Sequence, residues 1–284
     1  MDCGVAHYFT LQSIRPDSLA RALEERGFES LWCPEHSHIP LRSKGLPASG
    51  AGFPPEYSEV MDPFISLTAA ALTTKTLKLG TGACQITQRD PITTAKMVAS
   101  LDQLSHGRFL FGVGGGWHAG EMKNHGTEFS TRFELMRERI EAMRAIWTQA
   151  EPEYHGAFVD FDPIASFPKP FQNPHPPILV GGTYPYSAQR AVQYGNGWMP
   201  TRTRPEYEDV TEYLPDFRRM LAAAGRSIND VPVTVWAASA NADRLARYRD
   251  MGVARAVFYV GAKSEDEILP LLDRWAPLVG LLNR

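Results

Sequence analysis

Residues 79–117 constrain the fold of this chain more than any other stretch, because they combine two apolar strands, a helix and two turns rich in glycine. The pattern predicts one strand over residues 77–83 and a second over Phe109–Val113. Between them, Asp90 can cap a helix and Pro91 suits its first turn, where a missing N–H costs nothing. Two apolar strands joined by a helix form a βαβ unit, which predicts a parallel sheet covered by helices.

The rest of the chain repeats the same alternation of strands and helices. Eight strands alternating with helices in 284 residues predict a (β/α)8 barrel, a TIM barrel of the α/β class, as a single domain over residues 1–284. A doubly wound sheet is the alternative, although eight consecutive units without a second domain favour the barrel. The other predicted strands are 3–9, 28–33, 176–182, 195–200, 231–237 and 255–260. The other predicted helices have their apolar residues at 19–23, 65–72, 135–147, 188–194, 207–221 and 268–275. In the second of these helices Ile65, Ala69 and Leu72 share one face, a Thr131/Glu134 capping box precedes the third, and a Ser264/Glu267 cap precedes the last.

Composition excludes several classes of function. The chain is 43% hydrophobic and 21% charged, as in an ordinary globular protein that buries one large core. A net charge of −3 gives no electrostatic reason to bind nucleic acid or an acidic membrane surface. No apolar run reaches the roughly 20 residues of a membrane span, and the N-terminus lacks a signal-peptide pattern. Three cysteines without metal-type spacing favour a reduced, cytoplasmic protein.

The predicted strand ends carry few acids and bases but many glycines and aromatic residues. In a barrel of this kind the chemistry lies at the C-terminal ends of the strands. Tyr8 lies at the end of the first predicted strand, and the ends of the third, fourth and fifth are rich in glycine. This composition suits the binding of a planar cofactor better than a catalytic triad or a metal centre, so that the cofactor would supply the difficult chemistry.

His36 is the main candidate for acid–base chemistry, since it follows the second predicted strand. Three interpretations remain open at this point. His36 could exchange a proton with a substrate, or it could only satisfy a hydrogen bond in its loop. It could also bind a metal together with His38, but a metal hydrolase would need further ligands at later strand ends. The last strand ends in Val260 and Gly261 instead, so we predict no metal site.

Trp117 directly follows the glycine turn and is the tryptophan that we expect to face the pocket. Arg202 and Arg204 lie just after the sixth predicted strand, where they could contact a phosphate. The tryptophans that we expect in the core instead are Trp32, Trp147 and Trp198.

Several motifs in order resemble the bacterial luciferase-like flavin and deazaflavin oxidoreductases. They run from about residue 4 to residue 200, and no single one is decisive. Within that superfamily the chain resembles the branch that uses coenzyme F420, a deazaflavin that transfers hydride, more than the FMN monooxygenases. The motifs are EH after the second strand, LGTG, DP, AK, LDQLSHGR, GVGGGW, FPKPFQNPHPPILVGG and GNGW.

The resemblance implies roles for particular residues. The family's acid–histidine pair falls on Glu35 and His36, which places His36 beside the reactive face of the cofactor. The strand-three bulge that backs the cofactor ring, often with a non-prolyl cis peptide, falls on Gly82–Ala83. The backbone donors at the phosphate end of the cofactor fall on Gly115, Gly116, Gly181 and Gly182.

One position departs from the family. In the members that oxidise sugar phosphates, a glutamate follows the glycine turn and accepts a proton, whereas Trp117 stands here and the nearest acid is Glu121. We therefore expect an apolar or aromatic substrate stacked near Trp117 and Tyr8. The prediction is hydride transfer between F420 and a small organic molecule.

Two rival functions remain open. An FMN-dependent monooxygenase of the same fold would need oxygen and a partner reductase, and a binding protein would hold the cofactor without turnover. Members of the family are often dimers, so a homodimer is also expected.

Overall fold

The computed structural model describes residues 1–41, 53–201 and 209–282. Its main sheet has the strand order β10-β11-β1-β2-β3-β5-β8-β9, with β4 beside β5, and its pairings are parallel. A parallel bridge between Trp198 and Val233 joins the two edges, so the sheet is a nearly closed barrel. The strands are β1 (Asp2–Ala6), β2 (Ser30–Cys33), β3 (Lys78–Thr81), β4 (Cys84–Gln85), β5 (Phe109–Gly114), β8 (Ile178–Gly182), β9 (Gly197–Pro200), β10 (Thr234–Val235) and β11 (Arg255–Tyr259).

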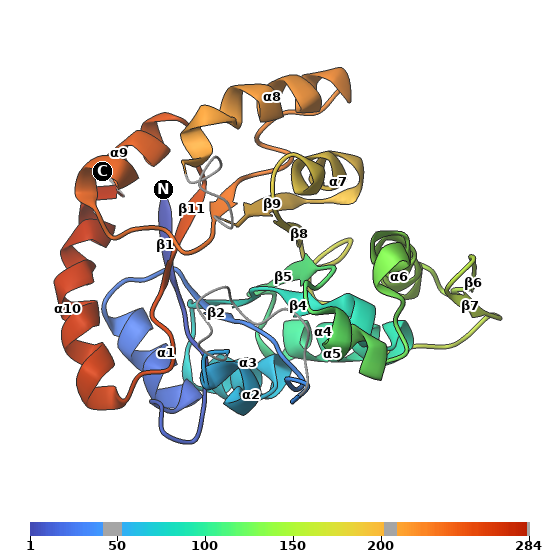
Figure 1. The fold of residues 1–284 in the computed structure, drawn as a ribbon, viewed down its shortest axis with the longest axis horizontal. Coiled ribbons are helices and arrows are strands. Elements are labelled where there is room, and N and C mark those ends of the chain that lie inside the picture. The colour runs from blue at the N-terminus through green and yellow to red at the C-terminus, as the bar shows by residue number, and fades with distance from the viewer. Residues whose placement is uncertain (42–52, 202–208, 283–284) are drawn as a thin grey trace.

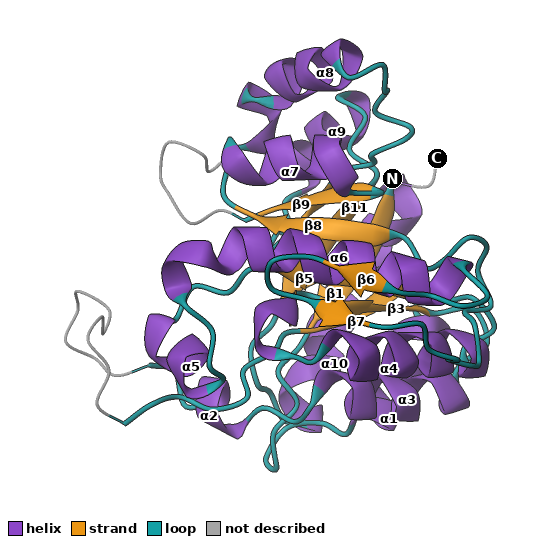
Figure 2. Ribbon diagram, turned by 90° about the vertical axis from the view of Figure 1, so that its right-hand side faces the viewer, coloured by secondary structure: helices purple, strands orange, loops and turns teal. Residues whose placement is uncertain are grey.

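Helices surround this barrel, and the strands lie between them in both views (Figures 1 and 2). The predicted (β/α)8 barrel is therefore confirmed, and the doubly wound alternative is wrong. No helix among the described residues is long and apolar enough to cross a membrane. The helices are α1 (Pro16–Glu25), α2 (Glu56–Glu59), α3 (Pro63–Thr73), α4 (Pro91–Leu104), α5 (Ala119–Asn124), α6 (Arg132–Thr148), α7 (Tyr186–Tyr194), α8 (Leu214–Ala223), α9 (Ala242–Asp250) and α10 (Glu265–Leu282).

Two of the three helix caps predicted above are present in the structure. The Asp90 carboxylate accepts the Thr93 N–H at 2.7 Å, and Asp62 caps α3 in the same way. Ser264 and Glu267 also bond to each other at the start of α10. The predicted capping box at Thr131 is wrong, because Phe129–Thr131 form a short 3₁₀ turn and the Thr131 hydroxyl donates to the Glu128 carbonyl instead.

The apolar face of α3 is a second correction. We expected Ile65 and Leu72 to face the core, but they are exposed, and the helix buries Phe64 and Leu67 instead. The helix is apolar nearly all round, so periodicity alone does not identify the inner face.

Besides the short helices α2 and α5 and the short strand β4, two further features were not predicted from the sequence. The first is α9, whose sequence is strongly charged and which buries only Leu245 and Tyr248. The second is an antiparallel hairpin of β6 (Tyr154–His155) and β7 (Asp160–Phe161), which lies beyond α6 at the edge of the barrel (Figure 1). The carboxylate of Glu138 on α6 accepts backbone N–H groups from the hairpin turn, among them that of Phe158 at 2.7 Å.

Candidate active site

A cavity of about 710 Å³ opens at the C-terminal ends of the barrel strands. This is the position at which (β/α)8 barrels carry their chemistry. Its walls are apolar and aromatic for the most part, with a small number of polar groups, as in cofactor sites. The lining residues are Tyr8, Pro34, Glu35, His36, Gly82, Ala83, Gln85, Gly114, Gly115, Gly116, Trp117, Phe129, Arg132, Phe133, Gly181, Gly182, Thr183, Tyr186, Arg190, Met199, Thr201 and Trp236.

His36, which lines this cavity, forms a buried pair with Glu121, and such a pair is suited to acid–base chemistry. His36 follows β2, and its Nδ1 lies 2.9 Å from Glu121 Oε2 on α5. The Glu121 side chain is fully buried and also accepts the Ser37 backbone N–H at 2.9 Å. Because a carboxylate accepts, the proton of a neutral His36 ring lies on Nδ1 and leaves Nε2 as a base.

The ionisation of Glu121 follows from these contacts. Burial acts to raise the pKa of its carboxyl group. The hydrogen bond and the charge of His36, together with the Ser37 N–H, outweigh burial and hold that pKa below its ordinary value. Glu121 is therefore a carboxylate near neutral pH, and it can stabilise a protonated His36.

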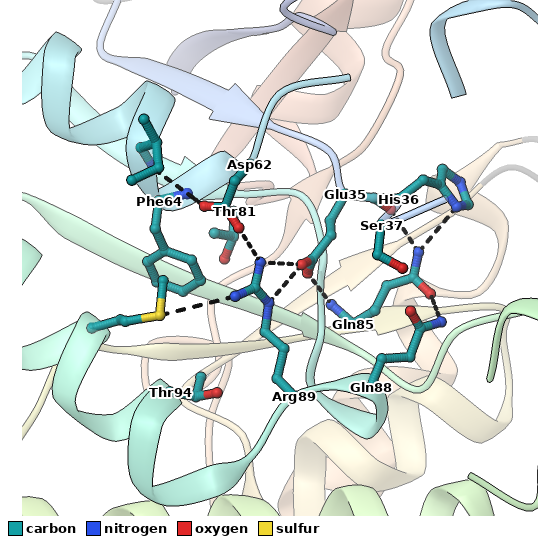
Figure 3. A network of polar contacts seen from close by, with 12 residues as sticks. Glu35, His36, Ser37, Asp62, Phe64, Thr81, Gln85, Gln88, Arg89 and Thr94 are labelled. Carbon is teal, nitrogen blue, oxygen red and sulfur yellow. Dashed lines mark hydrogen bonds and ion pairs between the residues drawn. The ribbon is translucent and has the colours of Figure 1, made fainter. Parts of the chain in front are cut away.

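Glu35 lies at the edge of the cavity, but its carboxylate is bound to protein groups (Figure 3). It pairs with the guanidinium of Arg89 and accepts the Gln85 backbone N–H at 2.7 Å. Arg89 also binds Asp62 at 2.6 Å, which connects the start of α3 to the same network. The Gln85 side chain donates to the Glu35 carbonyl and lies 3.3 Å from His36 Nδ1. Glu35 thus fixes the loop that carries His36, and it is placed for a supporting role.

Aromatic rings cover His36 on the side of the cavity mouth. Tyr57 stacks on the imidazole with ring centres 4.8 Å apart, and Trp117 meets it edge-on at 5.6 Å. Phe53 packs against both of these rings, and Tyr8, which follows β1 in the chain, contacts Tyr57. Trp117 nevertheless keeps 51% of its surface exposed, so it is available to a ligand that enters the cavity.

The backbone of two loops forms the opposite side of the cavity. The Gly82–Ala83 peptide that follows β3 is cis, and both residues line the cavity. The ring of Trp236 lies directly against Gly82, where any Cβ would overlap it. Gly116 has a φ of +72°, which favours glycine at this turn. A planar ligand can therefore approach main-chain atoms closely here.

Two arginines stand at one end of the cavity without a carboxylate partner among the described residues. The guanidinium of Arg190 on α7 lies 3.8 Å from the centre of the Phe133 ring, and that of Arg132 lies 4.2 Å from it. The Nε atoms of both are buried without a hydrogen-bond partner. Burial lowers the pKa of both guanidinium groups, and Arg132 further lowers that of Arg190. This cluster, Arg132–Phe133–Arg190, is suited to an anion beside Gly182.

The structure brings ten candidate site residues from the sequence to the same cavity. They come from the ends of strands that are far apart in the chain, and they are Tyr8, Glu35, His36, Gly82, Ala83, Gly115, Gly116, Trp117, Gly181 and Gly182. Trp32, Trp147 and Trp198 are buried in the core, as expected. Arg202 and Arg204 lie outside the described residues.

Sequence reasoning missed other parts of the cavity. Arg132 lies in the first turn of α6 and Arg190 in the middle of α7. At such positions a charged residue usually faces solvent. Trp236 lies at the end of a predicted strand, but the sequence did not indicate whether its side chain faces the cavity or the surrounding helices. Glu121 was noted only as the nearest acid to Trp117. Among the described residues, no group of three or more His, Cys, Asp or Glu side chains is arranged to hold a metal ion.

Comparison with known proteins identifies the family. Residues 17–267 match the family described as luciferase-like monooxygenase, and the chain belongs to it. An uncharacterised protein of Mycobacterium tuberculosis is 37% identical, with 97% of this chain and 98% of the relative covered. The FMNH(2)-dependent dimethylsulfone monooxygenase of Pseudomonas putida is 33% identical over 49% of this chain and 38% of its own length. The F420-dependent hydroxymycolic acid dehydrogenase of M. tuberculosis is 28% identical over 78% of this chain and 59% of its own length.

Fold, cavity and relatives together define a class of redox enzyme. Members of this luciferase-like class are oxidoreductases, and the relatives of this chain use either F420 or FMN.

Proposed function

We propose that this chain is an F420-dependent oxidoreductase that transfers a hydride between the deazaflavin and a small organic substrate. The observation that carries the proposal is the buried His36–Glu121 pair in a cavity whose other walls are aromatic rings and glycine backbone. The F420-dependent dehydrogenase among the relatives covers most of this chain and supports the choice of cofactor. The cytoplasm is the proposed location, and a homodimer the proposed assembly.

The residues of the cavity fit a phosphorylated planar cofactor. Its ring can lie against the Gly82–Ala83 backbone, because Trp236 fills the space behind Gly82. Gly116 and Gly182 line the cavity, and Arg132 and Arg190 supply positive charge without carboxylate partners among the described residues. These fixed donors and charges are what an anionic cofactor tail requires.

When bound, F420 supplies the site that accepts or releases hydride at C5 of its ring. His36 Nε2 takes the proton from a substrate hydroxyl as the hydride leaves, or returns it in the reverse direction. Glu121 holds the Nδ1 proton in place and stabilises the imidazolium that forms. Tyr57 and Trp117 exclude water from this position because their rings cover the imidazole.

The substrate that suits this cavity is apolar or aromatic and carries an alcohol or carbonyl group. Trp117 occupies the position at which the sugar-phosphate members of the family have an acid, and half of its surface is open to a ligand. Apolar rings dominate the mouth of the cavity, so a charged substrate would lose its hydration without finding a partner there.

The test is a search for substrates under anaerobic conditions with reduced F420. We expect small aromatic or apolar aldehydes, ketones or enones to be reduced, with the oxidation of F420 followed by its absorbance. The rival function is an FMN monooxygenase, and it predicts substrate-dependent oxygen consumption with reduced FMN supplied by a reductase. Oxygen consumption of that kind, with no turnover of F420, would contradict the proposal.

A further inference from the structure

A chain of polar side chains that do not line the cavity leads from the buried Glu121 to the surface of the protein. Glu121 is fully buried, whereas Ser37 and His125 are exposed. The Ser37 hydroxyl lies 3.3 Å from Glu121 Oε1 and 2.7 Å from His125 Nε2. It also lies 2.9 Å from His38 Nδ1. Three groups that can carry a proton therefore meet at one hydroxyl.

The direction of these hydrogen bonds follows from a count of protons. The amide nitrogen of Asn124 can only donate, and it lies 2.8 Å from His38 Nε2. The neutral His38 ring therefore carries its proton on Nδ1 and donates it to Ser37. The Ser37 hydroxyl keeps one proton to give, either to Glu121 or to His125. Ser37 is thus placed to pass a proton between these two groups.

The ionisation of His125 agrees with this direction. Partial burial and the neighbouring His38 lower the pKa of its ring below the ordinary value, in spite of the attraction of Glu121 and Glu35. His125 is therefore neutral near pH 7, with Nε2 free to accept the Ser37 proton.

We propose that Ser37 and His125 form a proton relay that connects His36 to solvent through Glu121, without opening the substrate cavity. The inference rests on the proposed function, because hydride transfer to the cofactor leaves one substrate proton on His36. While ligands fill the cavity, the imidazolium cannot lose a proton there, so the relay at Nδ1 is what discharges it before the product leaves. Ser37 and His125 act through His36 and are positioning residues rather than catalytic ones.

The proton balance of the relay is simple. Oxidation of an alcohol breaks the C–H bond, whose electron pair leaves as hydride to the cofactor, and the hydroxyl proton goes to His36 Nε2. His36 then releases its Nδ1 proton to Glu121, and the carboxyl group turns to present it to Ser37. Ser37 accepts that proton and gives its own to His125, which exchanges it with water. After the product has left, the proton on Nε2 passes to water in the emptied cavity, and the relay runs backwards to return a proton to Nδ1. Reduction of a carbonyl runs the same steps in reverse.

The test measures how fast the His36 Nδ1 proton exchanges with water, by NMR of the protein labelled with ¹⁵N-histidine and bound to F420. Ser37→Ala removes the hydroxyl but keeps the backbone N–H that binds Glu121. We expect this variant and His125→Asn to slow the exchange by at least about 10-fold, because a link of the chain is missing. Ser37→Thr keeps a hydroxyl and should retain the rate of the wild type, and added imidazole should restore it in His125→Asn.

Controls separate the relay from the proposed function. His155→Asn changes an exposed histidine on the hairpin and should leave the exchange rate unaltered. Ser37→Ala should bind F420 with unchanged affinity. Exchange at the wild-type rate in both Ser37→Ala and His125→Asn would overturn the relay. If the wild type fails to bind F420, the proposed function is wrong, and the same comparison on the ligand-free protein still decides the relay.

Discussion

At the scale of single residues, Glu121 determines what His36 can do. A carboxylate at Nδ1 fixes the tautomer of the neutral ring, so that Nε2 carries the free lone pair. The same carboxylate accepts the Ser37 backbone N–H, which holds it in place. Without such a partner, an imidazole in a loop would be free to rotate, and its Nε2 atom would not have a fixed position relative to a substrate.

The first prediction concerns the imidazole itself. His36→Ala should lower turnover by ~10²-fold or more, because the proton of the substrate loses its acceptor. The affinity for F420 should stay the same, since other groups hold the cofactor. Steady-state kinetics and a binding titration of the same variant measure the two effects. Unchanged turnover would reduce His36 to a structural residue of its loop.

The second prediction concerns the substrate contact at the mouth of the cavity. Trp117→Ala should raise the KM for an aromatic substrate by roughly 10-fold, because one stacking surface is lost. The affinity for F420 should not change. If both KM and turnover equal those of the wild type, the substrate does not bind at Trp117. Leu104→Ala, at an exposed position on α4, serves as the control.

At the scale of elements, helix starts and strand ends build the two ends of the cavity. The glycine turn after β5 leads into α5, which carries Glu121, and the next helix, α6, begins with Arg132. The guanidinium groups of Arg190 on α7 and of Arg132 both lie against the Phe133 ring. Each strand–loop–helix unit thus contributes one kind of group, so changes in one unit can alter anion binding without altering the acid–base pair.

This separation gives the third prediction. Arg132→Gln and Arg190→Gln should each weaken the binding of F420 roughly 10-fold, because a charge-assisted contact to its phosphate is lost. Binding of the deazaflavin ring without its phosphorylated tail should change little, and comparison of the two ligands by fluorescence titration measures the difference. Arg137→Gln is the matched control, since Arg137 lies on the exposed face of α6. Equal losses for both ligands would mean that the arginines contact the ring or support the fold.

The opposite end of the barrel is held by an ion-pair cluster that crosses three strands. Glu29, just before β2, binds Arg255 of β11 through two contacts and Lys78 of β3 at 2.9 Å. Burial acts to raise the pKa of Glu29, but Arg255 and Lys78 outweigh it and lower that pKa from 4.5 to about 2. The pairs therefore stabilise the closed barrel only while Glu29 is ionised.

The fourth prediction is a loss of stability in acid. A carboxyl whose pKa is lowered by folding stabilises the protein fully above its unfolded value of 4.5, and this contribution disappears as the pH falls to about 2. The contribution is on the order of 3 kcal/mol for such a shift. Urea unfolding should therefore show that the difference between wild type and Glu29→Gln shrinks over this range. Glu25→Gln, at an exposed position on α1, should show no such trend, and a constant difference for Glu29→Gln would contradict the account.

At the scale of the whole molecule, the order of strands and helices could be predicted from the sequence, but the contacts between distant side chains could not. Apolar runs and glycine turns define the βα units, and parallel pairing brings their ends to one edge. The helix α9 was missed because most of its residues face solvent. The pairing of His36 with Glu121 depends on the angle at which α5 leaves its loop, and no spacing in the sequence expresses that angle. The Arg132–Phe133–Arg190 cluster was missed because it depends on how α6 and α7 lie relative to each other, which the sequence spacing does not express either.

The measurement that tests the central claim most directly is titration of the purified protein with F420 and, separately, with FMN, followed by tryptophan fluorescence. Trp117 and Trp236 line the cavity, so a bound ring should quench their emission. We predict binding of F420 at micromolar concentration or tighter, and much weaker binding of FMN. Tight binding of FMN with weak binding of F420 would contradict the account and assign the chain to the oxygen-using branch of the family.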